Sequence, residues 1–486
     1  MTIENSGDTI NKLVPNQVGF WGLVFQGLGG IAPIGIMFAL IGVADFTSGA
    51  MALAYLLGFG GALLAGNSLF WFSRKIANAR GYYGYVNAGL GKYAGTFTAY
   101  SYIFYAASNA AGLILFYLVG FSGSLNQVFG TNLPWWVGIF FASSGLIVVF
   151  YGMYRGLKPS IRAMVVLGIA QVLVLTVISI IFMAHATDNT VKPFTPYVGW
   201  SDIFLGFVTG GYLAYGGYGS IISLGEETRT PNKTVGRAII VILLIGAFSW
   251  IIASYASATA WGLSNMSSFV SSEIPTVILA KKYTGLAGTA LMTLLYDIVI
   301  YTLLNNFLTS GSRVVYAMGR DKLLPESMAK IHPKYKAPIM GIIGITAITV
   351  LLAAVTTAVL IVDYGVPNGI IDSYIILGVL TTLLALLVHG LTNVSLVSSG
   401  LKKKFGKVSA QIGLTHLLLP VISLALTILA IYYAILGISF PFEAAPLVFV
   451  IFCVTLMVVM VVRKKKILDL KPIGESIEQV SSSGGE

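Results

Sequence analysis

The chain has 486 residues, of which 56% are hydrophobic and only 10% charged, and its mean hydropathy is +0.86. This balance excludes a water-soluble globular protein and indicates an integral membrane protein. The formal net charge of +11 does not indicate nucleic-acid binding here, because the basic residues lie in short loops between apolar runs.

The chain begins with a polar segment, residues 1–16, that lacks a short apolar core with a cleavage site. We therefore expect a cytoplasmic N-terminal tail rather than a cleaved signal peptide. Twelve apolar runs follow, each long enough to cross a bilayer, which requires ~20 helical residues. Their approximate cores are 18–43, 48–72, 94–122, 134–153, 163–185, 202–224, 238–262, 285–311, 339–362, 369–396, 413–437 and 442–462.

The first span is interrupted at its centre by four glycines and Pro33 within residues 26–35. Glycine weakens a helix and proline removes a backbone donor. Because an unpaired backbone group is costly in lipid, such a break is tolerated only where protein or water surrounds it. The pattern on its own fits either a binding site or a close helix-packing face.

A second glycine-rich interruption, between residues 206 and 219, lies in the sixth span. The second break lies five spans after the first, so spans 1 and 6 cross the membrane in opposite directions, as an inverted repeat of two five-span units requires. Paired interruptions in corresponding spans favour a transport site over mere packing. We predict an all-α fold with repeat units 17–185 and 198–400, an appended two-span hairpin 411–463 and a disordered cytoplasmic tail 464–486.

The basic residues predict the orientation of the chain. With the N-terminus inside, 26 of the 29 lysines and arginines fall on the cytoplasmic side, and only Lys192, Lys281 and Lys282 lie outside. This bias is typical of membrane proteins and places both termini in the cytoplasm. We expect a multi-pass protein of the plasma membrane, and the sequence does not indicate its oligomeric state.

Five separated motifs, in the right order, resemble the amino acid–polyamine–organocation (APC) family of secondary transporters. They are GLGGIAPIG (27–35), ARGYYGYV (79–86), GLKPSIR (156–162), AYGGY (214–218) followed by EETRTP (226–231), and SRVVYAMGRDKLLP (312–325). The resemblance covers about residues 15–400. It implies the LeuT-type fold, with spans 1 and 6 broken around a substrate such as an amino acid.

The resemblance assigns the substrate site to the two breaks and to span 8. Free amides at a helix N-terminus suit a carboxylate, and the family's Gly-x-Gly break falls on Pro33, Ile34 and Gly35. Proline lacks an N–H, so Ile34 and Gly35 would supply the donors. The carbonyls freed in span 6 would accept from a substrate ammonium. The expected substrate-binding residues are Ile31, Ala32, Pro33, Ile34, Gly35, Ala214, Tyr215, Gly216, Gly217 and Asn305.

Span 8 carries a polar stripe at a spacing of four residues: Asp297, Tyr301, Asn305 and Thr309. An acid at membrane depth is by default functional, so Asp297 is a candidate proton carrier. An acid in an outer aqueous vestibule, or one paired with Lys281 or Lys282, is the alternative. Proton-coupled relatives often place a lysine in span 5, and that position falls on Gln171, which cannot titrate. Coupling by H⁺ at Asp297, by Na⁺ held by span 1 carbonyls with Asn305 and Thr309, and uncoupled exchange all stay open.

These features predict a secondary transporter of an amino acid or related amine that works by alternating access, as a symporter or an exchanger. No cofactor or bound metal is expected, because no His/Cys cluster has metal-ligand spacing and no phosphate-binding Gly-Lys-Ser/Thr loop occurs. A channel and an APC-type carrier of another organic cation are the alternatives. An enzyme is disfavoured because no clustered catalytic residues are found. For His389, a role as a hydrogen-bonded structural residue is favoured over a role in relaying protons.

Overall fold

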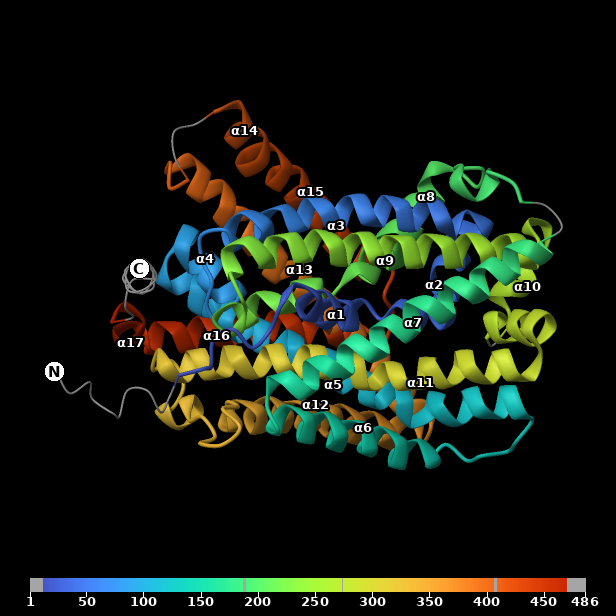
Figure 1. Ribbon diagram of the computed structural model, residues 1–486, viewed down its shortest axis with the longest axis horizontal. Coiled ribbons are helices and arrows are strands. Elements are labelled where there is room, and N and C mark those ends of the chain that lie inside the picture. The colour runs from blue at the N-terminus through green and yellow to red at the C-terminus, as the bar shows by residue number, and fades with distance from the viewer. Residues whose placement is uncertain (1–11, 187–188, 273, 406–408, 470–486) are drawn as a thin grey trace.

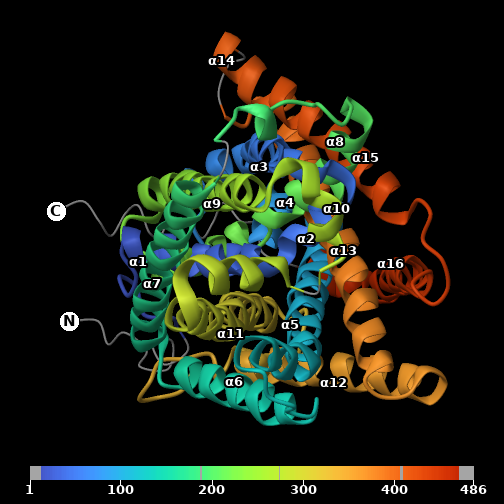
Figure 2. The ribbon, with the colours of Figure 1, turned by 90° about the vertical axis from the view of Figure 1, so that its right-hand side faces the viewer.

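The structure is a computed structural model that describes residues 12–186, 189–272, 274–405 and 409–469. This part of the chain is helical, as predicted, and one isolated β-bridge joins Val18 to Thr228. The long helices lie along one common direction (Figure 1) and form a bundle when seen end-on (Figure 2). Residues 1–11 and 470–486, which belong to the two predicted tails, lie outside the described residues.

The first half of the chain contains the first broken span and four continuous ones. Its elements are α1 (Phe20–Ile31), η1 (Pro33–Gly35), α2 (Ile36–Thr47), η2 (Ser48–Ala50), α3 (Met51–Ser73), α4 (Tyr82–Leu90), α5 (Lys92–Phe129), α6 (Val137–Tyr154), α7 (Leu157–His185) and η3 (Lys192–Phe194).

The second half begins with a span that is broken into short pieces. Its elements are α8 (Trp200–Gly206), η4 (Phe207–Gly211), η5 (Leu213–Tyr215), η6 (Tyr218–Glu227), α9 (Pro231–Trp261), η7 (Leu263–Asn265), α10 (Met266–Val270), α11 (Pro275–Arg320), η8 (Glu326–Ala329), α12 (Ile339–Tyr364), α13 (Asn368–Leu401), α14 (Ala410–Ile412), η9 (Gly413–Leu418), α15 (Leu419–Ile435), α16 (Ala444–Val462) and α17 (Lys464–Leu468). Here η4 and η9 are π-helical and the other η elements are 3₁₀ helices.

Ten helical stretches among the described residues are long and apolar enough to cross a membrane. One of them, Phe20–Ser73, contains the first two predicted spans, and the broken sixth span is too fragmented to qualify. The multi-pass helical architecture is therefore confirmed, while the count of twelve and the five-plus-five repeat stay predictions.

The interior of the bundle is built around α1, α5 and α11. The first of these packs against α7, α9 and α11, and α5 packs against both α11 and α13. The outward faces of the peripheral helices are apolar and exposed, as Val166, Leu351 and Val461 illustrate. Such a surface is suited to lipid, since a soluble monomer rarely exposes large contiguous apolar patches.

The two ends of the bundle carry different elements. One end carries α4 and α17, and the opposite end carries α8 and α10 (Figure 1); we call them the α4 end and the α10 end. The prediction of a disordered tail from residue 464 is wrong for the helical residues Lys464–Leu468. The side chain of Ile467 is buried, and Lys92 donates to the carbonyl of Leu468 at 2.5 Å, which holds this helix against the bundle.

Candidate functional site

Both predicted helix breaks are present. Helix α1 ends at Ile31, and Ala32 has left-handed backbone angles (φ 54°, ψ 72°) before the chain resumes in η1 and α2. In span 6 the break falls at Gly216, which is extended, and at Gly217, whose φ is +83°. Beyond it the chain continues as the 3₁₀ segment η6 to Glu227, so the irregular part of span 6 extends past the glycine-rich residues 206–219.

The two interrupted spans touch through backbone. A Cβ added at Gly30 would lie 2.9 Å from three backbone atoms of Gly217, and one added at Gly217 would lie 2.8 Å from the Cα of Gly30. Any side chain larger than hydrogen at either position would push the two chains apart. Glycine is thus required here for close approach, and at Gly217 also for its positive φ.

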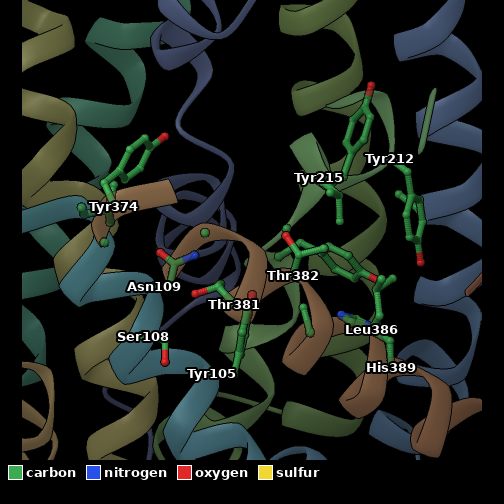
Figure 3. A pocket seen from close by; sticks show the side chains of 18 residues that line it. Tyr105, Ser108, Asn109, Tyr212, Tyr215, Tyr374, Thr381, Thr382, Leu386 and His389 are labelled. Carbon is green, nitrogen blue, oxygen red and sulfur yellow. The ribbon is translucent and has the colours of Figure 1, made fainter. Parts of the chain in front are cut away.

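A cavity of about 250 Å³ lies beside the span 6 break (Figure 3). Its walls come from α5, from residues 212–218 of span 6 and from α13, with a small contribution from α3. The polar side chains that line it are Tyr105, Ser108, Asn109, Tyr212, Tyr215, Tyr218, Tyr374, Thr381, Thr382 and His389. None of the described lining residues is an Asp, Glu, Lys or Arg.

Several polar atoms in the cavity wall have no partner within the described structure. The hydroxyls of Ser108, Tyr218 and Thr381 are buried and make no hydrogen bond. A buried hydroxyl without a partner carries a desolvation penalty, which a bound ligand would relieve. The arrangement can therefore bind a small polar molecule in neutral surroundings.

His389 joins the cavity wall to the α4 end. Its Nε2 lies 3.2 Å from the hydroxyl of Tyr82 in α4, and its ring also packs against that of Tyr218. The sequence interpretation of His389 as a hydrogen-bonded structural residue fits this contact, but did not place the residue in a cavity.

The predicted substrate residues are only partly brought together. Tyr215 and Gly216 line the cavity, and the Tyr215 hydroxyl donates to the carbonyl of Tyr55 at 3.0 Å. The remaining predicted residues at the breaks do not line it: Ile31, Ala32, Pro33, Ile34, Gly35, Ala214 and Gly217. The N–H of Gly35, an expected carboxylate donor, is already bonded to the carbonyl of Ala32 at 2.8 Å.

The predicted span 8 and span 5 residues lie elsewhere in the interior. The amide of Asn305 donates to Ser160 of α7 at 2.6 Å, and its oxygen accepts from Thr309 at 3.4 Å. Gln171 donates to Thr302 at 3.5 Å. Asn305 is thus satisfied by protein and lies outside the cavity, as do Gln171 and Thr309.

Asp297 is buried between α11 and α5, with 2% of its surface exposed. It accepts one hydrogen bond, from Ser124 at 3.3 Å. Neither Lys281 nor Lys282 forms an ion pair with it in the described structure. Burial away from solvent favours the interior interpretation of Asp297 over the vestibule interpretation.

The α4 end is closed by two ion pairs, of which one is buried and the other is partly exposed. Arg313 pairs with Glu227 at 2.9 Å, with side chains 1% and 3% exposed, and Arg320 pairs with Glu226 at 2.8 Å. The N–H groups of Gln17 and Val18 also donate to the carbonyl of Glu227. Both glutamates of the EETRTP motif thus pair with arginines of α11 at this end.

A third pair ties the loop before α4 to the end of α11. Arg80 donates twice to Asp321, both at 2.7 Å, and Tyr83 donates to the same carboxylate at 3.0 Å. Burial disfavours the charged form of Arg80, but the hydrogen bonds and charge of Asp321 outweigh it and raise the pKa of Arg80 above its ordinary value.

Sequence reasoning missed the contribution of α5 and α13 to the cavity. The adjacent polar pairs Ser108–Asn109 and Thr381–Thr382 lie within two of the predicted spans and could have indicated it. Nothing in the sequence says that these two pairs face each other across span 6.

Comparison with known proteins adds independent findings. The family model described as "Amino acid permease" matches residues 22–471. The chain is 24% identical over 351 residues to the branched-chain amino acid permease BcaP of Bacillus subtilis, a match that covers 67% of this chain and 72% of the relative. It is 26% identical over 238 residues to the methylthioribose transporter of the same organism, covering 48% of each. The fold is similar to that of MhsT, crystallised with L-phenylalanine, with a TM-score of 0.56 and 15% identity over 85% of this chain and 98% of that one.

Proposed function

Since the chain belongs to the amino acid permease family, a family of membrane transporters and not of enzymes, we propose that it carries a neutral amino acid by alternating access. The cavity at the span 6 break is the observation that carries this proposal. It combines an uncharged lining with three buried hydroxyls that lack partners.

The dimensions and chemistry of the cavity support an amino acid of moderate size. Its volume of about 250 Å³ is below the ~300–1,000 Å³ typical of pockets for drug-sized ligands. Ser108 and Thr381 offer hydrogen bonds to the charged ends of a zwitterion. The aromatic rings of Tyr105, Tyr215 and Tyr218 offer an apolar surface to its side chain. The similarity to BcaP, a branched-chain amino acid permease, supports the same class.

The absence of charge in the described lining argues against a charged substrate. A cationic or anionic side chain buried there would have no counter-charge, which is costly in a low-dielectric site. This disfavours an organic cation, although tyrosine rings can bind cations by cation–π contacts. The experiment below therefore includes charged amino acids and an organic cation as well as neutral amino acids.

The same proposal includes an orientation and a mode of transport. The α4 end faces the cytoplasm, because it carries most of the basic residues. In this conformation the ion pairs at that end are intact, so the cavity is separated from the cytoplasm. Transport is by symport or exchange in the plasma membrane, and release requires the α4 end to open.

Counterflow in proteoliposomes tests the proposal. Vesicles containing the full chain are loaded with unlabelled L-leucine, and the entry of labelled L-leucine from outside is measured. A carrier accelerates this entry, whereas a channel does not. L-phenylalanine, L-lysine, L-glutamate and choline are then supplied as competitors. Acceleration that neutral amino acids inhibit, and charged ones do not, is the expected result. Failure of every neutral amino acid tested to support counterflow would refute the proposal.

A further inference from the structure

Asp297 is a buried carboxyl without a counter-charge. Its one hydrogen bond in the described structure comes from Ser124, and none of the four ion pairs found there includes it. An ionised carboxylate in such surroundings loses its hydration without compensation, which costs several kcal/mol. The packed conformation therefore requires the neutral acid, or a cation brought from outside.

Among the residues that the structure describes, no charged side chain faces Asp297 from the helices packed around it. The titratable groups that interact with it are Tyr117 of α5 and Tyr296 of its own helix. Helix α13 adds Tyr374, which interacts with both tyrosines, and α6 adds the apolar ring of Phe141 against Tyr117. Ionisation of Asp297 would thus place a lone negative charge among phenols and aromatic rings.

The residue beside Asp297 contacts the outer half of the first broken span. Tyr296 stacks on Phe38 of α2, with ring centroids 3.4 Å apart and planes 14° from parallel. The carbonyl of Tyr296 accepts from Tyr117 at 2.7 Å. Thr276, near the start of α11, also donates to the carbonyl of Met37 in α2. Asp297 therefore lies next to the contact that holds α2 against α11, so a change in its charge acts close to that contact.

Polar side chains continue from Asp297 toward the α4 end on the same face of α11. Tyr301, Asn305 and Thr309 follow at intervals of four residues, or about 6 Å along the axis. The Tyr301 hydroxyl lies 3.2 Å from Ser144, and Asn305 contacts Ser160. Water that enters when the α4 end opens would meet this stripe first, which gives a proton on Asp297 a route of release.

We propose that Asp297 is the proton-carrying group of this transporter and that H⁺ is its coupling ion. The carboxylate takes up one proton from water on the α10 side while α2 and α11 are apart. The neutral acid then allows them to pack together with substrate bound, and the proton returns to water on the α4 side after that end opens. The inference rests on the proposed function and adds the coupling ion and its site.

The test separates exchange from accumulation in proteoliposomes that contain the full chain. Counterflow of labelled L-leucine is measured first, because it needs no gradient of the coupling ion. Net uptake is then driven by a gradient of one pH unit, alkaline inside, without sodium. At one proton per substrate the wild type should accumulate L-leucine up to about tenfold, because one pH unit corresponds to a tenfold ratio. Asp297→Asn should still exchange L-leucine but should not accumulate it.

Controls make the outcomes distinct. Asp363→Asn, which neutralises an exposed acid at the end of α12, should accumulate L-leucine as the wild type does. A pH dye trapped inside should report acidification on addition of L-leucine for the wild type and not for Asp297→Asn. Accumulation by Asp297→Asn, or accumulation by the wild type on a sodium gradient and not on a pH gradient, would overturn the proposal. Absence of wild-type counterflow would instead refute the transport function.

A second variant covers the case in which Asp297→Asn does not fold. Ser124→Ala removes the hydroxyl that donates to the carboxylate, so the neutral acid should persist to higher pH. The half-maximal pH of L-leucine uptake should then move in the alkaline direction. An unchanged midpoint in Ser124→Ala would count against Asp297 as the proton carrier.

Discussion

The contact between Gly30 and Gly217 allows a sharp prediction from a single methyl group. In Gly30→Ala the new Cβ would lie 2.9 Å from the backbone of Gly217, whereas ordinary contacts begin at 3.4 Å. The two broken spans must then separate by about 0.5 Å, an overpacking that typically costs about 1–3 kcal/mol. Because each 1.4 kcal/mol is a factor of ten, a cost of this size borne by the transport-competent state should lower counterflow of L-leucine about 5- to 100-fold.

The matched control lies in the same broken span. A Cβ added at Gly42 of α2 meets nothing within 4 Å. Gly42→Ala should therefore leave counterflow intact and stabilise the helix by up to about 1 kcal/mol. Both variants are compared for counterflow in proteoliposomes and for thermal unfolding in detergent. Equal transport by Gly30→Ala and Gly42→Ala would show that close approach of the two breaks is not required.

Two further predictions concern the closed α4 end and the cavity. Glu227→Gln leaves the buried guanidinium of Arg313 without its counter-charge and should destabilise the protein by about 3–5 kcal/mol, seen as a lower thermal unfolding temperature. Glu326→Gln, at an exposed pair, should change stability by less than about 1 kcal/mol; equal effects of the two would contradict the role of burial. Ser108→Ala should raise the half-saturating L-leucine concentration about two- to tenfold without lowering the unfolding temperature, because one hydrogen bond is worth about 0.5–1.5 kcal/mol. An unchanged half-saturating concentration would remove Ser108 from the substrate site.

The helix breaks were predictable because their cause is local. Glycine and proline act on their own backbone, so the clusters around Gly30 and Gly217 indicated where spans 1 and 6 are interrupted. The sequence could not show that the two glycines touch, since that depends on the packing of spans almost 190 residues apart. The glycines between residues 206 and 219 also gave no sign that the 3₁₀ segment continues to Glu227.

The cavity was less predictable because its walls are set by which face each helix turns inward. The position of Asn305 on the polar stripe of span 8 suggested a substrate contact, yet its amide is bonded to Ser160, 145 residues earlier in the chain. The polar pairs of α5 and α13 mark candidate positions, but which face of each helix turns inward depends on packing against distant helices, so the sequence could not assign it. The docking of α17 was also missed. Its basic composition suggests a solvated tail, and the burial of Ile467 against the bundle is visible only in the structure.

The free energy that substrate hydrogen bonds would contribute in the cavity is similar in size to the free energy needed to separate Arg313 from Glu227. This comparison bears on how substrate binding opens the α4 end. A ligand shifts a conformational equilibrium only by its difference in affinity for the two states. Three new hydrogen bonds, to Ser108, Tyr218 and Thr381, would contribute about 1.5–4.5 kcal/mol at 0.5–1.5 kcal/mol each. Separating Arg313 from Glu227 costs less than the ~3–5 kcal/mol of removing one partner, because water hydrates both charges when the end opens. Substrate binding can therefore supply the free energy that opens this closure, provided that its hydrogen bonds are strongest in the state in which the α4 end opens. In the proposed cycle, the proton gradient coupled through Asp297 determines in which direction substrate accumulates.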